Sequence, residues 1–221
     1  MNHIAVKKRI FLVDDHPLVC EWLTNLIQEQ PDLTICGETE SAPMALAAIG
    51  PAQADLVIVD INLKNSSGIE LTKSLKELHP EIPVLVLSMH DESLYADRAF
   101  RAGAKGYVNK RESTHKMVEA IRRVLDGKLY VSEKSAEILA AKAVRGRTMN
   151  RSAVESLSDR ELAVFERLGQ GIGTRQIAED FGVSVKTIQA YCARIKDKLT
   201  LNNATELMRE AVRWQDEKNS R

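Results

Sequence analysis

The stretch RIFLVDDHPLV (residues 9–19) decides how the N-terminal half of the chain folds. Four apolar residues, Ile10 to Val13, run directly into two adjacent carboxylates, Asp14 and Asp15. An uninterrupted apolar run of this length is typical of a strand that is buried on both faces. We therefore expect a buried strand that ends in a pair of negative charges.

The same pattern recurs along the first half of the chain. The later apolar runs are LTIC (33–36), LVIV (56–59), VLVL (84–87) and YV (107–108). Helices are expected at about residues 17–30, 42–50, 68–78, 92–102 and 113–126. This alternation of strands and helices predicts a parallel sheet with helices on both faces and right-handed crossovers. In such a sheet a ligand site lies beyond the carboxyl ends of the strands.

Carboxylates gather where these strands end. Asp14 and Asp15 follow the first strand and Asp60 ends the third, so parallel pairing brings all three to one rim of the sheet. Close carboxylates repel one another and raise their own pKa values. Mg²⁺ relieves that repulsion because it binds a few carboxylates, keeps water ligands and leaves positions for phosphate oxygens. The rim therefore predicts a magnesium site, although paired acids before Pro17 are also typical of an ordinary helix start.

Two further strand ends supply what phosphoryl transfer needs. Ser88 ends the fourth strand, where a hydroxyl can donate to a phosphoryl oxygen, and Lys110 ends the fifth, where an ammonium can neutralise one. Asp60 is then expected to act as the nucleophile and to form an acyl phosphate. The added charge is expected to draw the ends of the fourth and fifth strands inward.

The motifs around these residues resemble the receiver domain of bacterial two-component response regulators, over about residues 8–127. They are FLVDDHP, VDINL with Gly68 eight residues after its aspartate, LSMHD and GAKGYVNK. The resemblance implies Asp60 as the phosphoacceptor and Ser88 with Tyr107 as a switch pair, whose ring turns inward when the hydroxyl engages phosphate. The metal site that it implies consists of Asp14, Asp15, Asp60 and the backbone carbonyl of Asn62. Tyr107 also fits an edge-strand aromatic that packs on a helix.

Two positions depart from the pattern of that family. Lys64 stands where the family often has proline after the aspartate, and Arg111 follows Lys110 where many receivers have proline. Neither departure removes a reacting group. They leave open the geometry of these loops and the lifetime of the phosphorylated state.

The second half of the chain is more basic and lacks the strand pattern. Residues 1–132 carry 15 Lys and Arg against 18 Asp and Glu, whereas residues 133–221 carry 16 against 13. We interpret residues 128–154 as a short helix followed by a linker. Helices are then expected at 159–169, 174–181, 185–199 and from Asn203 to about 215. A basic helical domain of this kind suits a polyanionic partner, although so small an excess of charge is also common on solvated surfaces.

Start and stop signals mark these helices. Ser158 and Glu161 form an S-x-x-E capping box. Gly182 breaks the chain before the third helix, which Ser184 is placed to cap, and Asn203 is placed to cap the fourth. Two helices joined by a tight turn that contains glycine are the signature of a helix-turn-helix.

The residues of the helix over 185–199 indicate whether this domain binds DNA or whether the helix only packs in the domain. Its apolar face is centred on Ile188 and includes Val185, Cys192, Ile195 and Leu199. The residues expected to contact DNA are Lys186, Thr187, Gln189, Ala190, Ala193, Arg194 and Lys198. Cations meet phosphates, glutamine can pair with adenine and alanine can touch a thymine methyl group. A solvated helix face is the alternative, which Asp197 favours.

Residues 156–214 resemble the LuxR-type helix-turn-helix, and the two resemblances together identify a full-length response regulator of the NarL/FixJ family. They imply a four-helix domain that places 185–199 in the major groove and binds two half-sites as a dimer. The implied dimerisation residues are Leu207, Met208, Ala211 and Val212, which also fit the core of the domain. Gln189 stands where lysine is usual and Tyr191 where histidine is usual, so relatives do not reveal the target sequence.

The expected fold is α/β, a flavodoxin-like doubly wound five-stranded parallel sheet over residues 8–127. The linker (128–154) and a small all-α helix-turn-helix domain (155–216) follow. The expected protein is a response regulator in which a sensor histidine kinase or a small phosphodonor phosphorylates Asp60. With Mg²⁺ as cofactor, phosphorylation would switch binding to double-stranded DNA, with a homodimer forming on phosphorylation or on DNA.

Two other functions fit parts of the same sequence. An aspartate-nucleophile phosphohydrolase would want an acid two residues after Asp60, where Asn62 stands, so a turnover enzyme is not expected. A receiver that acts through protein contacts, with a helix-turn-helix that does not read DNA, stays open. The glycine-rich segment GQGIGT (169–174) follows a helix rather than a strand and is interpreted as a turn, not as a phosphate loop.

Cysteine usage and the N-terminus predict a cytoplasmic protein without a membrane partner. Cys20, Cys36 and Cys192 are widely spaced and lack metal-binding spacing, which is typical of reduced thiols. Only four uninterrupted apolar residues precede the aspartates, too few for the core of a signal peptide or for a membrane span.

Overall fold

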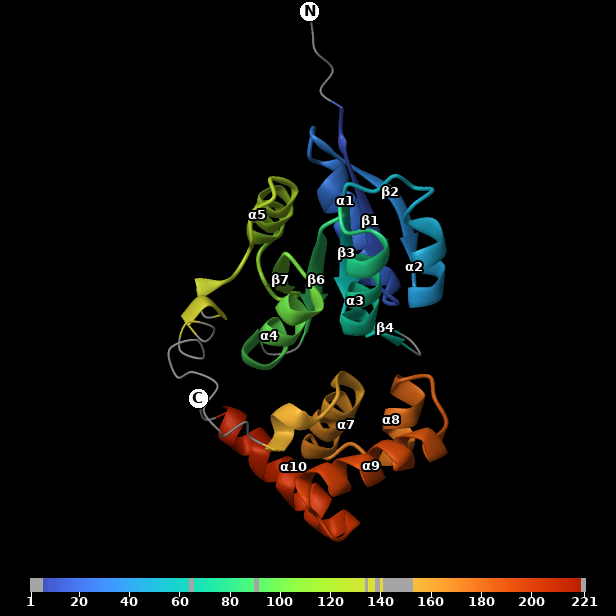
Figure 1. Cartoon of the computed structure of the whole chain (residues 1–221), viewed down its shortest axis with the longest axis vertical. Helices are drawn as coiled ribbons and strands as arrows, with labels where there is room; N and C mark the ends of the chain where they lie inside the picture. The colour runs from blue at the N-terminus through green and yellow to red at the C-terminus, as the bar shows by residue number, and fades with distance from the viewer. Residues whose placement is uncertain are drawn as a thin grey trace, which may run out of the picture. The chain divides into compact units, whose positions relative to one another are not determined.

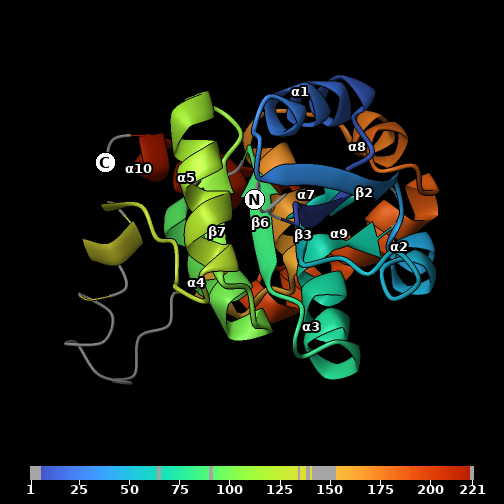
Figure 2. The ribbon, with the colours of Figure 1, turned by 90° about the horizontal axis from the view of Figure 1, so that it is seen from above.

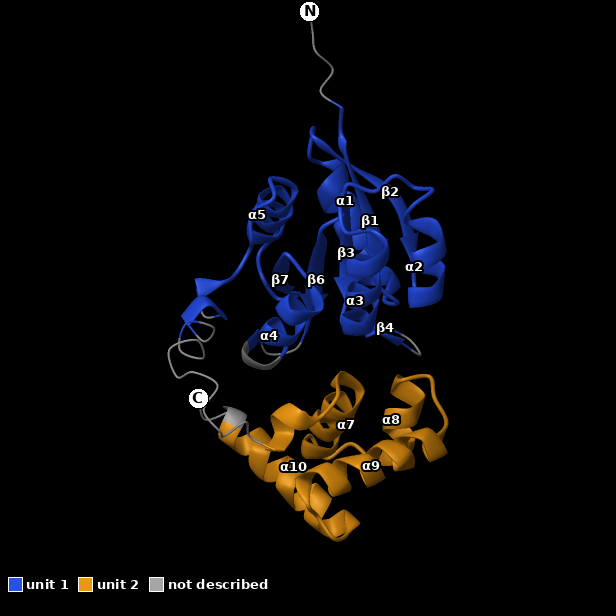
Figure 3. Ribbon diagram, viewed as in Figure 1, with its two compact units in different colours: residues 1–147 blue, residues 148–221 orange. Residues whose placement is uncertain are grey.

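The computed structural model describes residues 6–63, 66–89, 92–133, 135–137, 140 and 153–219. The chain divides into two compact units, residues 1–147 and residues 148–221 (Figure 3). Among the described residues, no helix is long and apolar enough to cross a membrane. Outside the described residues lie Lys64, His90, Asp91 and the stretch 141–152 of the expected linker.

A five-stranded parallel sheet with the order β2-β1-β3-β6-β7 organises the first unit (Figure 1). Its strands are β1 (Lys8–Val13), β2 (Leu33–Thr39), β3 (Leu56–Asp60), β6 (Val84–Ser88) and β7 (Gly106–Asn109). Its helices are α1 (Pro17–Gln28), α2 (Ala42–Ala48), α3 (Gly68–Leu78), α4 (Glu92–Ala102) and α5 (Thr114–Leu125). The order is that of a flavodoxin-like doubly wound sheet, so the predicted fold of this half is confirmed.

Helices cover both faces of this sheet, with α1 and α5 over one face and α3 and α4 over the other (Figure 2). Ile10 and Leu12 belong to the core that α1 and α5 close. Phe11 and Val13 are equally buried, and the alternation of side chains along a strand directs them to the opposite face. The apolar run is continuous because β1 is buried on both sides.

A short hairpin joins β3 to α3, and the sequence analysis did not anticipate it. Strands β4 (Asn62–Leu63) and β5 (Ser66–Ser67) pair in antiparallel fashion. The Gly68 amide then donates to the Ile61 carbonyl at 2.8 Å, which brings the start of α3 back against the end of β3. Strands of two residues are too short to show a periodic pattern.

Tyr130 adds to the edge of the sheet beyond β7. It forms a parallel bridge with Gly106, and its amide donates to the Lys105 carbonyl at 2.9 Å. The Tyr107 amide donates in turn to the Tyr130 carbonyl at 3.4 Å. The chain therefore stays attached to the sheet past residue 127, where we expected the linker to begin.

The second unit is helical throughout its regular elements. They are the 3₁₀ turn η1 (Ala153–Ser156) and the helices α7 (Asp159–Gly169), α8 (Thr174–Asp180), α9 (Val185–Leu199) and α10 (Ala204–Asn219). This confirms the small all-α domain. The 3₁₀ turn spans the expected boundary between linker and helix-turn-helix domain at residues 154 and 155, α8 ends one residue earlier than predicted, and α10 runs beyond 215.

The predicted caps form in this unit. Ser158 and Glu161 make the complete capping box. The Ser184 hydroxyl accepts from the Thr187 amide at 3.1 Å, and the Asn203 side-chain oxygen accepts from the Glu206 amide at 2.9 Å. Gly182 has φ 63°, a left-handed conformation that glycine adopts without strain and that ends α8.

Gly68 offers a test of how tightly α3 is packed against β3. A Cβ at this position would lie 1.9 Å from the Asp60 carbonyl oxygen, which is backbone and cannot move aside alone. We expect Gly68→Ala to lower the free energy of unfolding of the first unit by about 3 kcal/mol. Urea unfolding of the full chain measures it, through Trp22 fluorescence in a Trp214→Phe background.

The matched control is Gly50→Ala, because a Cβ there would meet only the ring of His79, at 3.3 Å. A side chain can yield by a few tenths of an ångström, so this change should cost less than about 1 kcal/mol. Equal unfolding midpoints for Gly68→Ala and the parent protein would show that the contact is not tight.

Candidate functional site

Three carboxylates meet where β1 and β3 end. Asp14 and Asp15 directly follow β1, Asp60 is the last residue of β3, and the two strands are neighbours in the sheet. Each of these residues and His16 offers a ligand atom, and the four atoms lie within 4.8 Å of one another. Asp14 and Asp60 are only 5% and 3% exposed. We call Asp14, Asp15 and Asp60 the acidic cup.

Lys110 neutralises the acidic cup from the far side of β6. Its ammonium lies 2.6 Å from Asp14 Oδ2 and 3.0 Å from Asp60 Oδ2. The Lys110 backbone amide also donates to the Ser88 carbonyl at 2.8 Å, so the turn after β7 is tied to the end of β6. The structure thus brings together the cation and the acids that the sequence predicted at separate strand ends.

Burial and charge act in opposite directions on this cluster. Burial raises the pKa of Asp60 to about 6, and Asp14 adds to the rise, while the Lys110 ammonium works against it. Burial works to lower the pKa of Lys110, but the Asp60 and Asp14 carboxylates outweigh it, so that pKa is raised. Lys110 therefore stays charged, whereas burial of Asp60 as a carboxylate is costly.

His16 is a member of this cluster that sequence reasoning missed. Its Nδ1 lies 2.9 Å from Asp14 Oδ1, 3.1 Å from Asp15 Oδ1 and 3.7 Å from Asp60 Oδ2. The His16 backbone amide also donates to Asp14 Oδ1 at 2.9 Å. The available signal was its place directly after the paired aspartates, at the turn into α1.

The donor set of the acidic cup fits Mg²⁺. Its members are hard carboxylate oxygens, which this ion prefers. Within the described part of the chain the buried Asp15 Oδ1 accepts no hydrogen bond, although the His16 ring lies 3.1 Å from it, so this oxygen lacks the donor that buried polar atoms normally have. Asn62, the expected carbonyl ligand, begins β4 two residues after Asp60. The cup is therefore suited to hold a divalent cation through a few oxygens.

The expected switch pair lies on the two strands beyond β3. Ser88 ends β6 and is fully buried, while Tyr107 on β7 pairs with Val86 of β6. Tyr107 is 1% exposed, so its ring lies inside the unit rather than in solvent. Burial of the ring fits both an inward switch position and an aromatic that packs on a helix, the two alternatives that the sequence left open.

Helix α9 of the second unit presents the face expected to read DNA. Ile188 and Ile195 are fully buried, which places the apolar face in the core as predicted. The expected contact residues that are exposed are Lys186, Gln189, Ala190, Ala193, Arg194 and Lys198, while Thr187 is half-buried. The Arg194 guanidinium lies 4.9 Å from the centre of the Tyr191 ring.

Lys198 differs from the other cations on α9. Its ammonium lies 2.6 Å from Glu161 Oε2 and donates to the Ser156 carbonyl at 3.2 Å. Burial alone would raise the pKa of Glu161, but hydrogen bonds from Lys198 and Ser158 bring it below its usual range. In this structure Lys198 ties α9 to the start of α7, a role that the sequence analysis did not foresee.

The residues expected at a dimer interface divide into two kinds. Leu207 and Ala211 are 3% and 0% exposed and form part of the core of the second unit, which is the alternative that the sequence left open. Met208 and Val212 are each 38% exposed. Of these four residues, Met208 and Val212 are the ones that a partner could reach.

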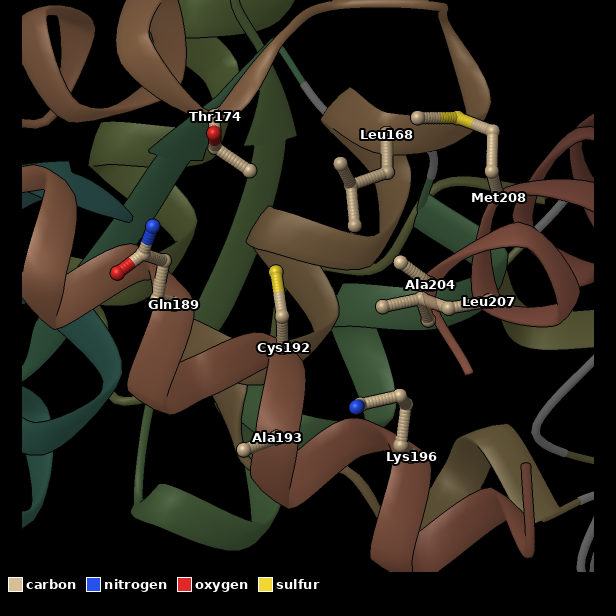
Figure 4. A pocket seen from close by; sticks show the side chains of 9 residues that line it. All are labelled: Leu168, Thr174, Gln189, Cys192, Ala193, Lys196, Ala204, Leu207 and Met208. Atoms are coloured by element: carbon tan, nitrogen blue, oxygen red, sulfur yellow. The ribbon is translucent and has the colours of Figure 1, made fainter. Parts of the chain in front are cut away.

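A groove of about 350 Å³ runs beside α9 and the start of α10 (Figure 4). It is lined by Leu168, Thr174, Gln189, Cys192, Ala193, Lys196, Ala204, Leu207 and Met208. Gln189 and Ala193 therefore belong both to the exposed face of α9 and to the wall of this groove.

Comparison with known proteins identifies both units. Residues 10–122 match the family model of the response regulator receiver domain, and residues 155–211 match that of bacterial regulatory proteins of the luxR family. The chain is 34% identical to the transcriptional activator protein ExaE of Pseudomonas putida over 203 residues, 92% of this chain and 95% of ExaE. It is 32% identical to the transcriptional regulatory protein UhpA of Escherichia coli over 200 residues, 90% and 95% of the two chains.

Solved structures agree with this result. A two-component response regulator of the LuxR family from Aurantimonas sp. is 34% identical, with a TM-score of 0.59 over 62% of this chain and 99% of that one. RcsB from Salmonella enterica bound to promoter rprA shares the fold, with 21% identity and a TM-score of 0.60 over 92% and 97%. The named relatives are transcription regulators rather than turnover enzymes. The chain therefore belongs to the NarL/FixJ family of response regulators, with a receiver domain followed by a LuxR-type DNA-binding domain.

Proposed function

We propose that phosphorylation of Asp60 switches DNA binding by the LuxR-type domain. The observation that carries the proposal is the meeting of the acidic cup with the Lys110 ammonium at one rim of the sheet. The phosphoryl donor is a sensor histidine kinase or a small phosphodonor. Because the partners are a signalling kinase and DNA, we place the protein in the cytoplasm.

Asp60 is the nucleophile in this proposal. One of its carboxylate oxygens attacks the phosphorus of the donor, and the bond from phosphorus to the donor's leaving group breaks. Mg²⁺, held by the acidic cup and the Asn62 carbonyl, would supply positive charge for the phosphoryl oxygens. Lys110 already lies 3.0 Å from Asp60 and neutralises part of the same charge. The Ser88 hydroxyl would donate to a phosphoryl oxygen, with Tyr107 filling the space behind it.

The second unit supplies the output in this proposal. Lys186 and Arg194 would meet phosphates, and Gln189 with Ala190 and Ala193 would lie against base edges in the major groove. Thr187, at the start of α9, and Lys198 complete the expected set of DNA contacts. Lys198 would first have to break its ion pair with Glu161. Dimerisation through Met208 and Val212, beside the buried Leu207 and Ala211, would place two such helices on two half-sites. We take residues 8–127, 128–154 and 155–216 as receiver, linker and DNA-binding domain.

The proposal predicts one phosphoryl group on the protein. Intact-mass spectrometry after incubation with Mg²⁺ and acetyl phosphate should show a single adduct on the wild type and none on Asp60→Asn, because the nucleophile is removed. Asp126→Asn, a change at an exposed aspartate away from the cup, should be labelled like the wild type. Equal labelling of Asp60→Asn would place the phosphoryl group on another residue.

Removing the Asp60 charge should stabilise the magnesium-free protein. A raised folded-state pKa means that the folded state prefers the protonated form, so this stabilisation is present at low pH and is lost as pH rises through about 6. At pH 7.5 we expect Asp60→Asn to raise the free energy of unfolding by about 2 kcal/mol in the presence of a chelator.

Urea unfolding with chelator and with excess Mg²⁺ measures this effect. The cation stabilises the wild type by binding the folded cup, so the advantage of Asp60→Asn should shrink or reverse when Mg²⁺ is added. Asp126→Asn should leave the midpoint unchanged in both conditions. A wild type that is more stable than Asp60→Asn without Mg²⁺ would contradict the electrostatic cost assigned to Asp60.

Lys186→Ala/Arg194→Ala should weaken binding to a mixed-sequence DNA duplex and reduce the dependence on salt. Each lost phosphate contact lowers the slope of log affinity against log salt by about 0.9. Fluorescence anisotropy at several salt concentrations measures both quantities. The matched control is Lys73→Ala/Arg101→Ala, which removes two exposed charges from the receiver. If the wild type binds no duplex even when phosphorylated, the receiver acts through protein contacts instead.

A further inference from the structure

A carboxylate on the receiver holds two serines from the stretch that follows α5. Glu92 is the first residue of α4 and is only 8% exposed. Its Oε2 accepts hydrogen bonds from the hydroxyls of Ser132 and of Ser135, the latter at 2.7 Å. Ser135 is itself 2% exposed, and its amide donates to the Ser132 hydroxyl at 3.1 Å. We call Glu92, Ser132 and Ser135 the clasp.

The clasp is strong for a contact between a helix and a connecting segment. Hydrogen bonds from hydroxyls to an ionised carboxylate are shorter and stronger than those between neutral groups. A carboxylate at the N-terminus of a helix is also favoured by the helix dipole. Because Glu92 and Ser135 are buried, separating them would leave polar groups that need new partners.

The clasp lies close in the chain to both members of the proposed switch pair. Glu92 follows Ser88 by four residues, at the far end of the connection from β6 to α4. On the other side, Tyr107 and Tyr130 share a backbone hydrogen bond, two residues before Ser132. A shift of Ser88 would therefore act on this segment through Glu92, and a shift of β7 would act on it through Tyr130.

We propose that the α4–β7 edge of the receiver is a docking site for residues 130–133 and Ser135, and that phosphorylation strengthens this docking through the clasp. The inference rests on the proposed function, since it concerns how the phosphorylated state of Asp60 is read out. We assign its direction from the structure, in which the Tyr107 ring is buried while the clasp is closed. The proposal therefore pairs the docked segment with the buried position of the Tyr107 ring.

Hydrogen exchange in the full chain, with and without Mg²⁺ and beryllium trifluoride as a phosphoryl mimic, tests this inference. The amides of Tyr130, Ser135 and Ala136 each donate a hydrogen bond in the docked segment, so a peptide covering 128–137 reports on docking. Beryllium trifluoride should slow exchange of this peptide about fivefold in the wild type. In Ser132→Ala/Ser135→Ala the exchange should be fast and insensitive to the mimic.

Linkage gives a second readout that loss of packing alone would not move. If the mimic strengthens the clasp, the clasp must strengthen binding of the mimic by the same factor. Ser132→Ala/Ser135→Ala should therefore bind beryllium trifluoride about fivefold more weakly in a fluorine NMR titration. Glu92→Gln keeps an acceptor oxygen and should retain part of the effect. Glu133→Gln, a matched carboxylate-to-amide change at an exposed residue between the serines, should behave like the wild type.

The outcomes separate the two proposals. Bound mimic with unchanged exchange at 128–137, or a serine variant indistinguishable from the wild type in both readouts, would overturn the clasp proposal alone. Failure of the mimic to bind the wild type would overturn the proposed phosphorylation switch and the clasp proposal with it.

Discussion

The ion pairs of the buried Lys110 ammonium with Asp14 and Asp60 are the interaction on which the rim of the receiver depends. Several carboxylates cannot all stay ionised in a buried cluster unless a cation lies among them. Because the acids end β1 and β3 while the lysine follows β7, these pairs tie together strand ends on both sides of β6. A change of charge on Asp60 therefore alters the force that holds the end of β7 in place.

The two buried carboxylates Asp60 and Glu92 are stabilised in different ways. Asp60 shares a fixed cation with Asp14, which suits a group that must remain a nucleophile and receive more negative charge. Glu92 is held by serine hydroxyls from a segment 40 residues further along the chain. Serine hydroxyls carry no charge, so opening this contact leaves one unpaired charge for water to solvate, whereas opening a Lys110 pair would leave two. The receiver thus combines a permanent electrostatic site with a reversible attachment.

Features that follow from hydrophobic periodicity or from strand topology were predictable from the sequence. Contacts that depend on the conformation of one side chain were not. Apolar runs such as Ile10 to Val13 gave the strands, and parallel pairing then required Asp14 and Asp60 to be neighbours. The reach of His16 depends on the turn into α1, which no spacing rule describes. The pairing of Lys198 with Glu161 needs the packing of α9 on α7 to be known. Tyr130 and the clasp join residues without any local pattern, in a stretch that the sequence marks only as a short helix and a linker.

The energy of the clasp is of the size that a phosphorylation switch needs. Moving two states from a ratio of 1:99 to 99:1 takes about 5.5 kcal/mol, and two hydrogen bonds to a charged group, at about 1.5–3 kcal/mol each, contribute about 3–6 kcal/mol. A contact much stronger than these two hydrogen bonds would keep the segment docked whether or not Asp60 is phosphorylated. A much weaker one would not transmit the added charge at all. Glu92 lies four residues from Ser88, and Ser132 lies two residues from Tyr130. The free energy of the two hydroxyl–carboxylate bonds is therefore in the range where the charge on Asp60 can decide which state prevails.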